Sequence, residues 1–280
     1  MSARLSLWIA AVLGLVGGFA FDRAQVDHET RVVFLSVGQG DSTLFMSEGW
    51  TMVVDVAARQ EGFDAGERLV APSLRRYGVR KIDCLVLTHP DLDHVGGLPA
   101  VAARFEIGQV VASAAFRNDE EMLDALGRAR ISPEQVTWVK GAVTTKIGKF
   151  DVKIIAPFLS RGGEPNDGSL FMRVESGKGS IAMSGDAPST VEDPIGEAFD
   201  FDVQVLKAGH HGSRFSTSSE WLEATSPSVV IASCGRRNTY GHPHPFVIDR
   251  VRKQGADFLR TDRDGSIEFL LEDSGFVRAR

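Results

Sequence analysis

The chain has 280 residues, 43% of them hydrophobic, and a formal net charge of -6 at pH 7. This composition excludes a disordered or collagen-like chain, and the length suffices for one large hydrophobic core or two small ones. Because the net charge is negative, the protein as a whole does not attract nucleic acid. Binding of a polyanion would therefore require a local basic patch or a bound cation.

The first twenty residues combine one positive charge with a long uncharged run. Arg4 precedes the 17 residues LSLWIAAVLGLVGGFAF, and Asp22 and Arg23 follow them. This pattern predicts a signal peptide or a single membrane anchor over residues 1–24. Ala20 is small enough for cleavage after it, but the pattern does not decide between cleavage and retention. In both cases we expect an extracytoplasmic protein that is periplasmic, secreted or anchored to the membrane.

Apolar patterning predicts one compact domain over residues 31–280. Strands are expected over 30–37, 43–46, 50–56, 81–88 and 109–113, within 136–184, and over 201–209, 227–235, 255–261 and 265–272. Helices are expected over 65–77, 94–105, 119–129, 217–224 and 245–254. Strands that come first and then alternate with helices in both halves predict an α/β sandwich.

The two cysteines, Cys84 and Cys234, fall in two of these predicted strands. Each is therefore expected to be a small buried hydrophobic residue, although a disulfide between them remains an alternative. Since the chain has no CxxC pair, a cysteine-rich zinc site is excluded.

The segment VLTHPDLDHVGG, residues 86–97, places four metal-ligand side chains in six positions directly after a predicted strand. These are His89, Asp91, Asp93 and His94. Imidazole nitrogen and carboxylate oxygen together suit Zn²⁺, Mn²⁺ or Fe. Side chains so close in the chain cannot all point at one ion, so we expect two adjacent ions. The alternative is that Asp91 or Asp93 only caps the helix that follows.

Further aspartate and histidine residues follow three other apolar strands. Asp186 lies in MSGDA, His210 and His211 lie in LKAGHHGS, and His242 and His244 lie in YGHPHP. Together with the segment 86–97, the segments LKAGHHGS and YGHPHP contain six of the seven histidines, two in each, and only His28 stands apart. This distribution favours a metal site over scattered structural histidines.

Several motifs in order carry a family resemblance: FLSVGQGDS, VVDV, LVLTHPDLDHVGGL, NDGSL, SGDA, LKAGHHGS, YGHPHP and RTDRDGSI. Together they resemble the metallo-β-lactamase-fold domain of the ComEC family of DNA-uptake channel proteins, over residues 31–271. The resemblance implies an αββα four-layer sandwich of two mixed sheets with a metal site at one edge. Because no run of 18 apolar residues occurs beyond the N-terminal segment, we expect a stand-alone hydrolase without the multi-spanning channel of that family.

The resemblance also implies the metal ligands of two divalent ions, Zn or Mn. The superfamily motif His-x-His-x-Asp-His falls on residues 89–94, with Asp91 in place of the middle histidine, as in the ComEC-like branch. His89 and Asp91 then serve one ion, Asp93 and His94 serve the other, and Asp186 bridges them. The remaining implied ligands are His211 and His242.

Other roles are expected partly from the resemblance and partly from nearness to these loops in the sequence. Arg236 and Arg237 lie near them as well and are candidates to neutralise phosphates, with simple solvation of the arginines as the alternative. Asp93, His210 and His242 are the expected catalytic residues. Lys207, Ser213, Arg214 and Asn166 are the expected substrate contacts, and Asn166 stands where the wider superfamily has a histidine. Asp41 and Asp55 are expected to support the site from behind its ligands.

The implied function is that of a phosphodiesterase or nuclease, in which a metal-activated hydroxide cleaves DNA or another phosphodiester. The expected partner is therefore nucleic acid or a small phosphodiester, with possible membrane attachment through the N-terminal segment and no protein partner identifiable. Two alternatives stay open. One is hydrolysis of a lactam, lactone or thioester on the same scaffold, and the other is a non-catalytic DNA-binding or uptake accessory module.

Overall fold

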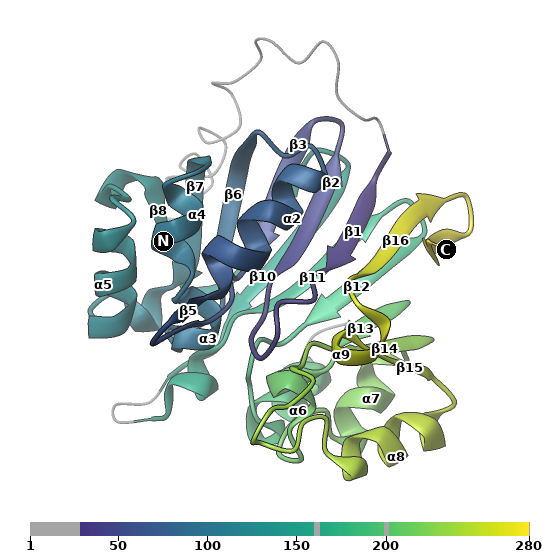
Figure 1. The fold of residues 1–280 in the computed structure, drawn as a ribbon. Helices are drawn as coiled ribbons and strands as arrows, with labels where there is room; N and C mark the ends of the chain where they lie inside the picture. Colours follow the sequence, from purple (N-terminus) through teal and green to yellow (C-terminus); the bar gives the residue numbers. More distant parts are fainter. Residues whose placement is uncertain (1–28, 160–162, 199–201, 280) are drawn as a thin grey trace, which may run out of the picture.

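The computed structural model describes residues 29–159, 163–198 and 202–279, so the expected signal peptide or anchor over residues 1–24 lies outside them. No helix in these described ranges combines the length and the apolar character needed to span a bilayer. Two mixed sheets pack face to face, and helices cover the outer face of each (Figure 1). This arrangement confirms the four-layer α/β sandwich.

The first sheet has eight strands in the order β17-β16-β1-β2-β3-β6-β7-β8. Their bounds are Arg31–Phe34 for β1, Thr43–Ser47 for β2, Trp50–Val54 for β3, Lys81–Leu87 for β6, Glu106–Ser113 for β7, Val136–Val139 for β8, Ile267–Glu272 for β16 and Gly275–Arg278 for β17. Strands β3, β6, β7 and β8 run parallel to one another, whereas the other pairings are antiparallel. A separate hairpin joins β4 (Arg59–Gln60) and β5 (Phe63–Asp64).

The second sheet has seven strands in the order β15-β14-β13-β12-β11-β10-β9. Their bounds are Gly141–Ile147 for β9, Phe150–Ala156 for β10, Phe171–Ser176 for β11, Gly179–Met183 for β12, Val205–Lys207 for β13, Val229–Ala232 for β14 and Asp257–Arg260 for β15. Strands β12 to β15 are parallel. The loops that follow β12, β13 and β14 therefore leave the sheet at the same edge, where side chains can converge on a site.

Helices and short helical turns connect the strands. On the side of the first sheet they are η1 (Gly66–Val70), α2 (Ala71–Arg76), α3 (Leu92–Val95), α4 (Leu98–Ala102), η2 (Ala114–Phe116), α5 (Glu120–Arg128) and η3 (Pro133–Gln135). Associated with the second sheet are η4 (Pro165–Gly168), α6 (Ser189–Ala198), η5 (Gly209–Gly212), α7 (Ser219–Thr225), α8 (Pro245–Gln254) and α9 (Thr261–Asp264).

The main core lies between the two sheets and is built from large apolar side chains of both. Phe45 of the first sheet meets Phe150 of the second edge-to-face, with ring centroids 5.5 Å apart. Each outer layer buries a further apolar cluster between its helices and its sheet. Burying this surface supplies most of the stabilising free energy and fixes the loops at the sheet edge.

Three features of the chain differ from the sequence-based expectation. The helix expected over 94–105 is two short helices, α3 and α4, separated at Gly96 and Gly97. A Cβ on Gly97 would lie 2.1 Å from the carbonyl oxygen of Val56, so close packing against another loop sets the break. Helix α6 was not expected, and β17 follows the strand that was expected to close the chain.

Cys84 and Cys234 are both buried free thiols, which confirms the expected buried residues and excludes the disulfide. Burial raises the pKa of each thiol to about 12. Both thiols therefore stay protonated and unreactive at neutral pH.

Candidate metal centre

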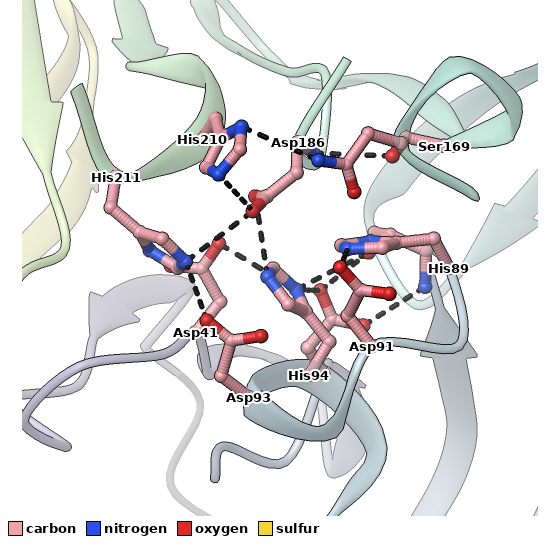
Figure 2. A network of polar contacts seen from close by, with 12 residues as sticks. Asp41, His89, Asp91, Asp93, His94, Ser169, Asp186, His210 and His211 are labelled. Carbon is pink, nitrogen blue, oxygen red and sulfur yellow. Dashed lines mark hydrogen bonds and ion pairs between the residues drawn. The ribbon is translucent and has the colours of Figure 1, made fainter. Parts of the chain in front are cut away.

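Four buried side chains from four loops converge at the edge where β6, β12 and β13 end (Figure 2). They are Asp41, His94, Asp186 and His211, and one possible ligand atom from each lies within 4.8 Å of the others. Because strands deliver these loops to one edge, residues that are up to 170 positions apart in the chain become neighbours.

Asp186 lies at the centre of this group. Its Oδ1 atom is 3.2 Å from Nε2 of His94, and its Oδ2 atom is 3.4 Å from Nε2 of His211. Nε2 of His211 also lies 3.1 Å from Oδ2 of Asp93. The two carboxylate oxygens of Asp186 thus face two different imidazoles, a placement that suits a bridging ligand.

Three imidazoles are held from behind, at Nδ1, by groups that fix their tautomers. Nδ1 of His94 lies 2.8 Å from the carboxylate of Asp55, and Nδ1 of His211 lies 3.1 Å from the carbonyl oxygen of Ser233. Both partners can only accept, so both Nδ1 atoms carry the proton. Thr88 donates its one hydroxyl proton to Asp55 and lies 3.0 Å from Nδ1 of His89, whose ring is therefore the donor there. In each ring, Nε2 is therefore the atom that faces the site and would bind a metal ion.

His89, Asp91, His210 and His242 surround the central group. Nε2 of His89 lies 3.6 Å from Oδ2 of Asp91, and the ring centroids of His89 and His94 are 4.1 Å apart. Nε2 of His210 lies 3.6 Å from Oδ2 of Asp186, and the ring centroids of His210 and His242 are 5.6 Å apart. The structure therefore brings all seven expected metal ligands together.

Buried polar atoms without a hydrogen-bond partner are concentrated in this group. Among the described residues they include His89 Nε2, His94 Nε2, Asp186 Oδ1, Asn166 Oδ1 and His242 Nδ1. A buried polar atom left without a partner typically costs about 1–3 kcal/mol. Lone pairs of nitrogen and carboxylate oxygen aimed at one place are the donor set of a Zn²⁺, Mn²⁺ or Fe site, so these residues fit such an ion.

The carboxylates control the protonation of the two central histidines. Burial disfavours the imidazolium of His94, but Asp186 and Asp55 outweigh burial and raise the pKa of His94 well above its usual value. For His211, Asp186 and Asp41 likewise outweigh burial and raise the pKa to about 10. In return, although burial alone would raise it, the pKa of Asp186 is held well below its usual value by both histidines. The site thus has a negative field that attracts a cation.

His242 has the opposite shift. Burial, followed by repulsion from His211 and His210, lowers the pKa of His242 to about 4. Its ring is therefore neutral at physiological pH, which is the form that binds a metal ion.

Lys207 is placed differently from the sequence-based expectation. Its Nζ atom lies 2.5 Å from Oδ2 of Asp41, and both side chains are only 3% exposed. The expected contact of Lys207 with substrate phosphate is therefore wrong, because its ammonium group is buried and already paired. Asp41 lies among the four ligand atoms of the central group, 3.8 Å from Nδ1 of His94 and 3.6 Å from Nδ1 of His211, so its expected role behind the ligands stays a prediction.

The other expected substrate contacts lie around His210. Nδ2 of Asn166 is 3.5 Å from Nδ1 of His210. Ser213 is buried, and its backbone N–H donates to the carbonyl oxygen of His210, so it supports the loop. Arg214 is exposed, and its guanidinium lies over the ring of Phe215, 4.6 Å from the centroid.

Two supporting residues were missed by sequence reasoning. Thr88 links Asp55 to His89, and Ser169 accepts a hydrogen bond from the backbone N–H of Asp186 at 3.2 Å. Thr88 directly precedes His89 and Ser169 follows the NDG turn, so adjacency to these motifs was the available signal.

The loop that carries His210 and His211 has a strained backbone. Both residues have a positive φ, 47° and 56°, which a non-glycine residue adopts at an energetic cost. The buried carboxyl of Glu192 anchors this loop, because it accepts the Thr217 backbone N–H at 2.5 Å and the Ser184 hydroxyl at 2.9 Å. Glu192 thereby ties the η5 loop to the strand end that carries Asp186.

Residues 35–236 match the family model of the Metallo-beta-lactamase superfamily. The chain belongs to this superfamily, which confirms the family and the fold that the motifs implied.

Two curated proteins are similar in sequence to most of this chain. The chain is 32% identical over 273 residues to Competence protein ComA of Neisseria gonorrhoeae, which covers 95% of this chain and 36% of that protein. It is 28% identical over 265 residues to ComE operon protein 3 of Bacillus subtilis (strain 168), which covers 88% of this chain and 33% of that protein. The chain thus spans about a third of the length of these relatives. These matches confirm the ComEC-like resemblance.

Solved structures share the fold at low sequence identity. CmlA, a diiron beta-hydroxylase from Streptomyces venezuelae, superposes with a TM-score of 0.59 at 16% identity, over 85% of this chain and 53% of that chain. This likeness shows that the fold is shared.

Proposed function

We propose that this protein is a metal-dependent hydrolase that cleaves DNA or another phosphodiester in an extracytoplasmic location. The observation that carries the proposal is the position of Asp186, whose two carboxylate oxygens face Nε2 of His94 and Nε2 of His211 in a buried group of imidazoles and carboxylates. The similarity to Competence protein ComA supports DNA as the substrate over a lactam or a lactone.

In this proposal His89, Asp91, Asp93, His94, Asp186, His211 and His242 hold two divalent cations, Zn or Mn. Such cations lower the pKa of bound water and stabilise negative charge on phosphoryl oxygens. The protein's own contribution is to fix the ligand tautomers through Asp55, Thr88 and the carbonyl oxygen of Ser233.

His210 has the geometry to donate a hydrogen bond to a bound substrate. Its side chain is 32% exposed, so it is the more accessible of the two histidines in this loop. Nδ2 of Asn166 donates toward Nδ1 of His210, and this leaves the proton on Nε2. Burial lowers the pKa of His210. We assign Nε2–H of the neutral His210 ring as a hydrogen-bond donor that holds a phosphoryl oxygen of the substrate.

The experiment strips the full chain of metal, supplies Mn²⁺ or Zn²⁺, and tests single-stranded DNA, bis-p-nitrophenyl phosphate, a lactone and a β-lactam. We expect metal-dependent cleavage of the two phosphodiesters. Asp186→Asn should abolish this cleavage, whereas Asp119→Asn, at a distant helix N-cap, should retain it. Cleavage of only the lactone or β-lactam would overturn the proposal, and DNA retention without cleavage of any substrate would indicate a binding module.

A further inference from the structure

Exposed apolar side chains lie beside the candidate metal centre in the sequence. Among the described residues, eight large hydrophobic side chains are exposed. Four of these lie within four residues of an expected metal ligand: Leu92, Phe215, Tyr240 and Phe246. Large contiguous apolar patches mark binding sites, whereas single exposed apolar residues are normal, so a ligand contact has to rest on the geometry of the individual residue.

Tyr240 has the most specific geometry of the four. Its ring stacks on the imidazole of His242, with centroids 5.7 Å apart and an angle of 25° between the planes. Tyr240 is nevertheless 67% exposed, so most of its surface remains available to a ligand. The tyrosine thus extends the imidazole surface of the site outward as a second flat ring.

The loop that presents Tyr240 is held by defined contacts. Nδ2 of Asn238 donates to the carbonyl oxygens of Gly235 and His242, both at 2.7 Å, and Oδ1 of Asn238 accepts the backbone N–H of His242 at 2.8 Å. A Cβ on Gly235 would lie 2.9 Å from the backbone nitrogen of Gln39, so this loop also packs closely on the loop before β2. A loop fixed in this way loses little backbone entropy when a ligand binds.

Cationic side chains accompany the exposed rings. Arg236 and Arg237 are exposed on the same loop as Tyr240, and Nε of Arg236 donates to the carbonyl oxygen of Asp262 at 3.1 Å. Arg214 covers one side of Phe215 on the η5 loop. Proteins that bind unpaired nucleic acid strands combine aromatic rings, on which bases stack, with cations along the phosphate backbone. A lactam or lactone substrate would require neither feature.

We propose that Tyr240 forms a stacking subsite for an unpaired nucleobase beside the phosphodiester held at the metal centre, with Arg236 and Arg237 facing the adjacent phosphates. This inference rests on the proposed function and narrows its substrate to a strand with accessible bases. A base inside a duplex is stacked on both faces, so continuous duplex DNA and small phosphodiesters without a base should bind more weakly.

The test measures the Kd of a fluorescent oligothymidylate and of an abasic oligonucleotide of equal length, in Asp186→Asn protein that cannot hydrolyse them. Base stacking on one aromatic ring contributes about 1–3 kcal/mol, so Tyr240→Ala should weaken oligothymidylate binding by about 5- to 150-fold. Binding of the abasic strand should stay unchanged. Tyr240→Trp should retain tight binding, and Leu123→Ala, an exposed residue on α5, serves as the control.

Equal losses on both strands would overturn the subsite, because Tyr240 would then only support His242. An absence of any loss would overturn it as well. The proposed function can fail independently of the subsite. If the wild-type protein binds oligothymidylate through Tyr240 but cleaves no phosphodiester, the stacking subsite is supported and the hydrolase activity is excluded. Cleavage of DNA with a KM that Tyr240→Ala does not change would remove the subsite alone.

Discussion

Nδ1 of His94 lies 2.8 Å from Oδ2 of Asp55, and both side chains are fully or almost fully buried. Because a carboxylate only accepts, this contact holds the proton of the His94 ring on Nδ1 and leaves Nε2 free toward Asp186. Asp55 therefore sets the form in which His94 can bind a metal ion, although it is not expected to touch the ion itself.

Asp55→Asn should disrupt this control. An amide would donate to Nδ1 and drive the proton to Nε2, so we expect metal affinity to fall by about 10- to 100-fold. Asn tolerates the positive φ of 59° at this position, so the backbone should be preserved. Calorimetric titration with Zn²⁺ or Mn²⁺ measures the affinity, and Asp119→Asn is the matched control. Wild-type affinity in Asp55→Asn would exclude the orienting role.

Lys207→Met should test the buried pair with Asp41. Removing the ammonium leaves a buried carboxylate without its cation, which typically costs about 3–5 kcal/mol in the free energy of unfolding. The exposed pair of Lys146 and Asp151, 3.4 Å apart, offers a matched control, because Lys146→Met should cost less than about 1 kcal/mol. Urea unfolding measures both losses. Similar small losses in the two variants would show that the Lys207 pair contributes no net stability.

The sequence predicted the ligand group better than it predicted its supports. Histidines and aspartates placed after apolar strands had to meet at the sheet edge, because strand ends share that edge. Lys207 also lies at a strand end, directly before the loop of His210 and His211. The direction of its side chain, however, depends on Asp41, 166 positions away in the chain. Local patterning carries no information about such a partner.

The same limit applies to the backbone. The pattern over 94–105 is helical, yet the chain breaks at Gly96 and Gly97 because the loop that contains Val56 packs against it. Helix α8, whose bounds depend on a local proline start and a glycine end, was expected over the same residues that form it. Elements set by local signals were therefore predictable, whereas those set by distant packing were not.

Glu192 should make stability depend on pH. Burial raises its pKa to about 8 from the ordinary value of 4.5, although hydrogen bonds from Ser184 and Thr217 oppose the shift. Between these two pKa values the folded state holds a proton that the unfolded state releases. The contribution of Glu192 is therefore fully present below pH 4.5 and is lost as the pH rises toward 8, by up to about 1.4 kcal/mol per pH unit.

Glu192→Gln should remove this dependence. Its amide can accept the Thr217 N–H and donate to the Ser184 hydroxyl, so the loop contacts are retained. We expect the free energy of unfolding of the wild type to fall from pH 5 to pH 8 relative to that of Glu192→Gln. Urea unfolding at each pH measures the difference, and Glu220→Gln, an exposed change on α7, should follow the wild type. Parallel curves for wild type and Glu192→Gln would contradict the raised pKa.

Removing the metal should lower thermal stability. An ion that binds only the folded state adds RT ln(1 + [M]/Kd), about 2.7 kcal/mol when its concentration is 100 times Kd. For a chain of this length that corresponds to a fall in Tm of roughly 5–10 °C on chelation. Scanning calorimetry before and after chelation, with metal content followed by mass spectrometry, measures the effect. Asp186→Asn lacks the central carboxylate, so its Tm should respond little to chelator or to added Mn²⁺ or Zn²⁺. If complete metal removal leaves the wild-type Tm unchanged, or if Asp186→Asn responds as strongly as the wild type, then the group around Asp186 is not the metal site.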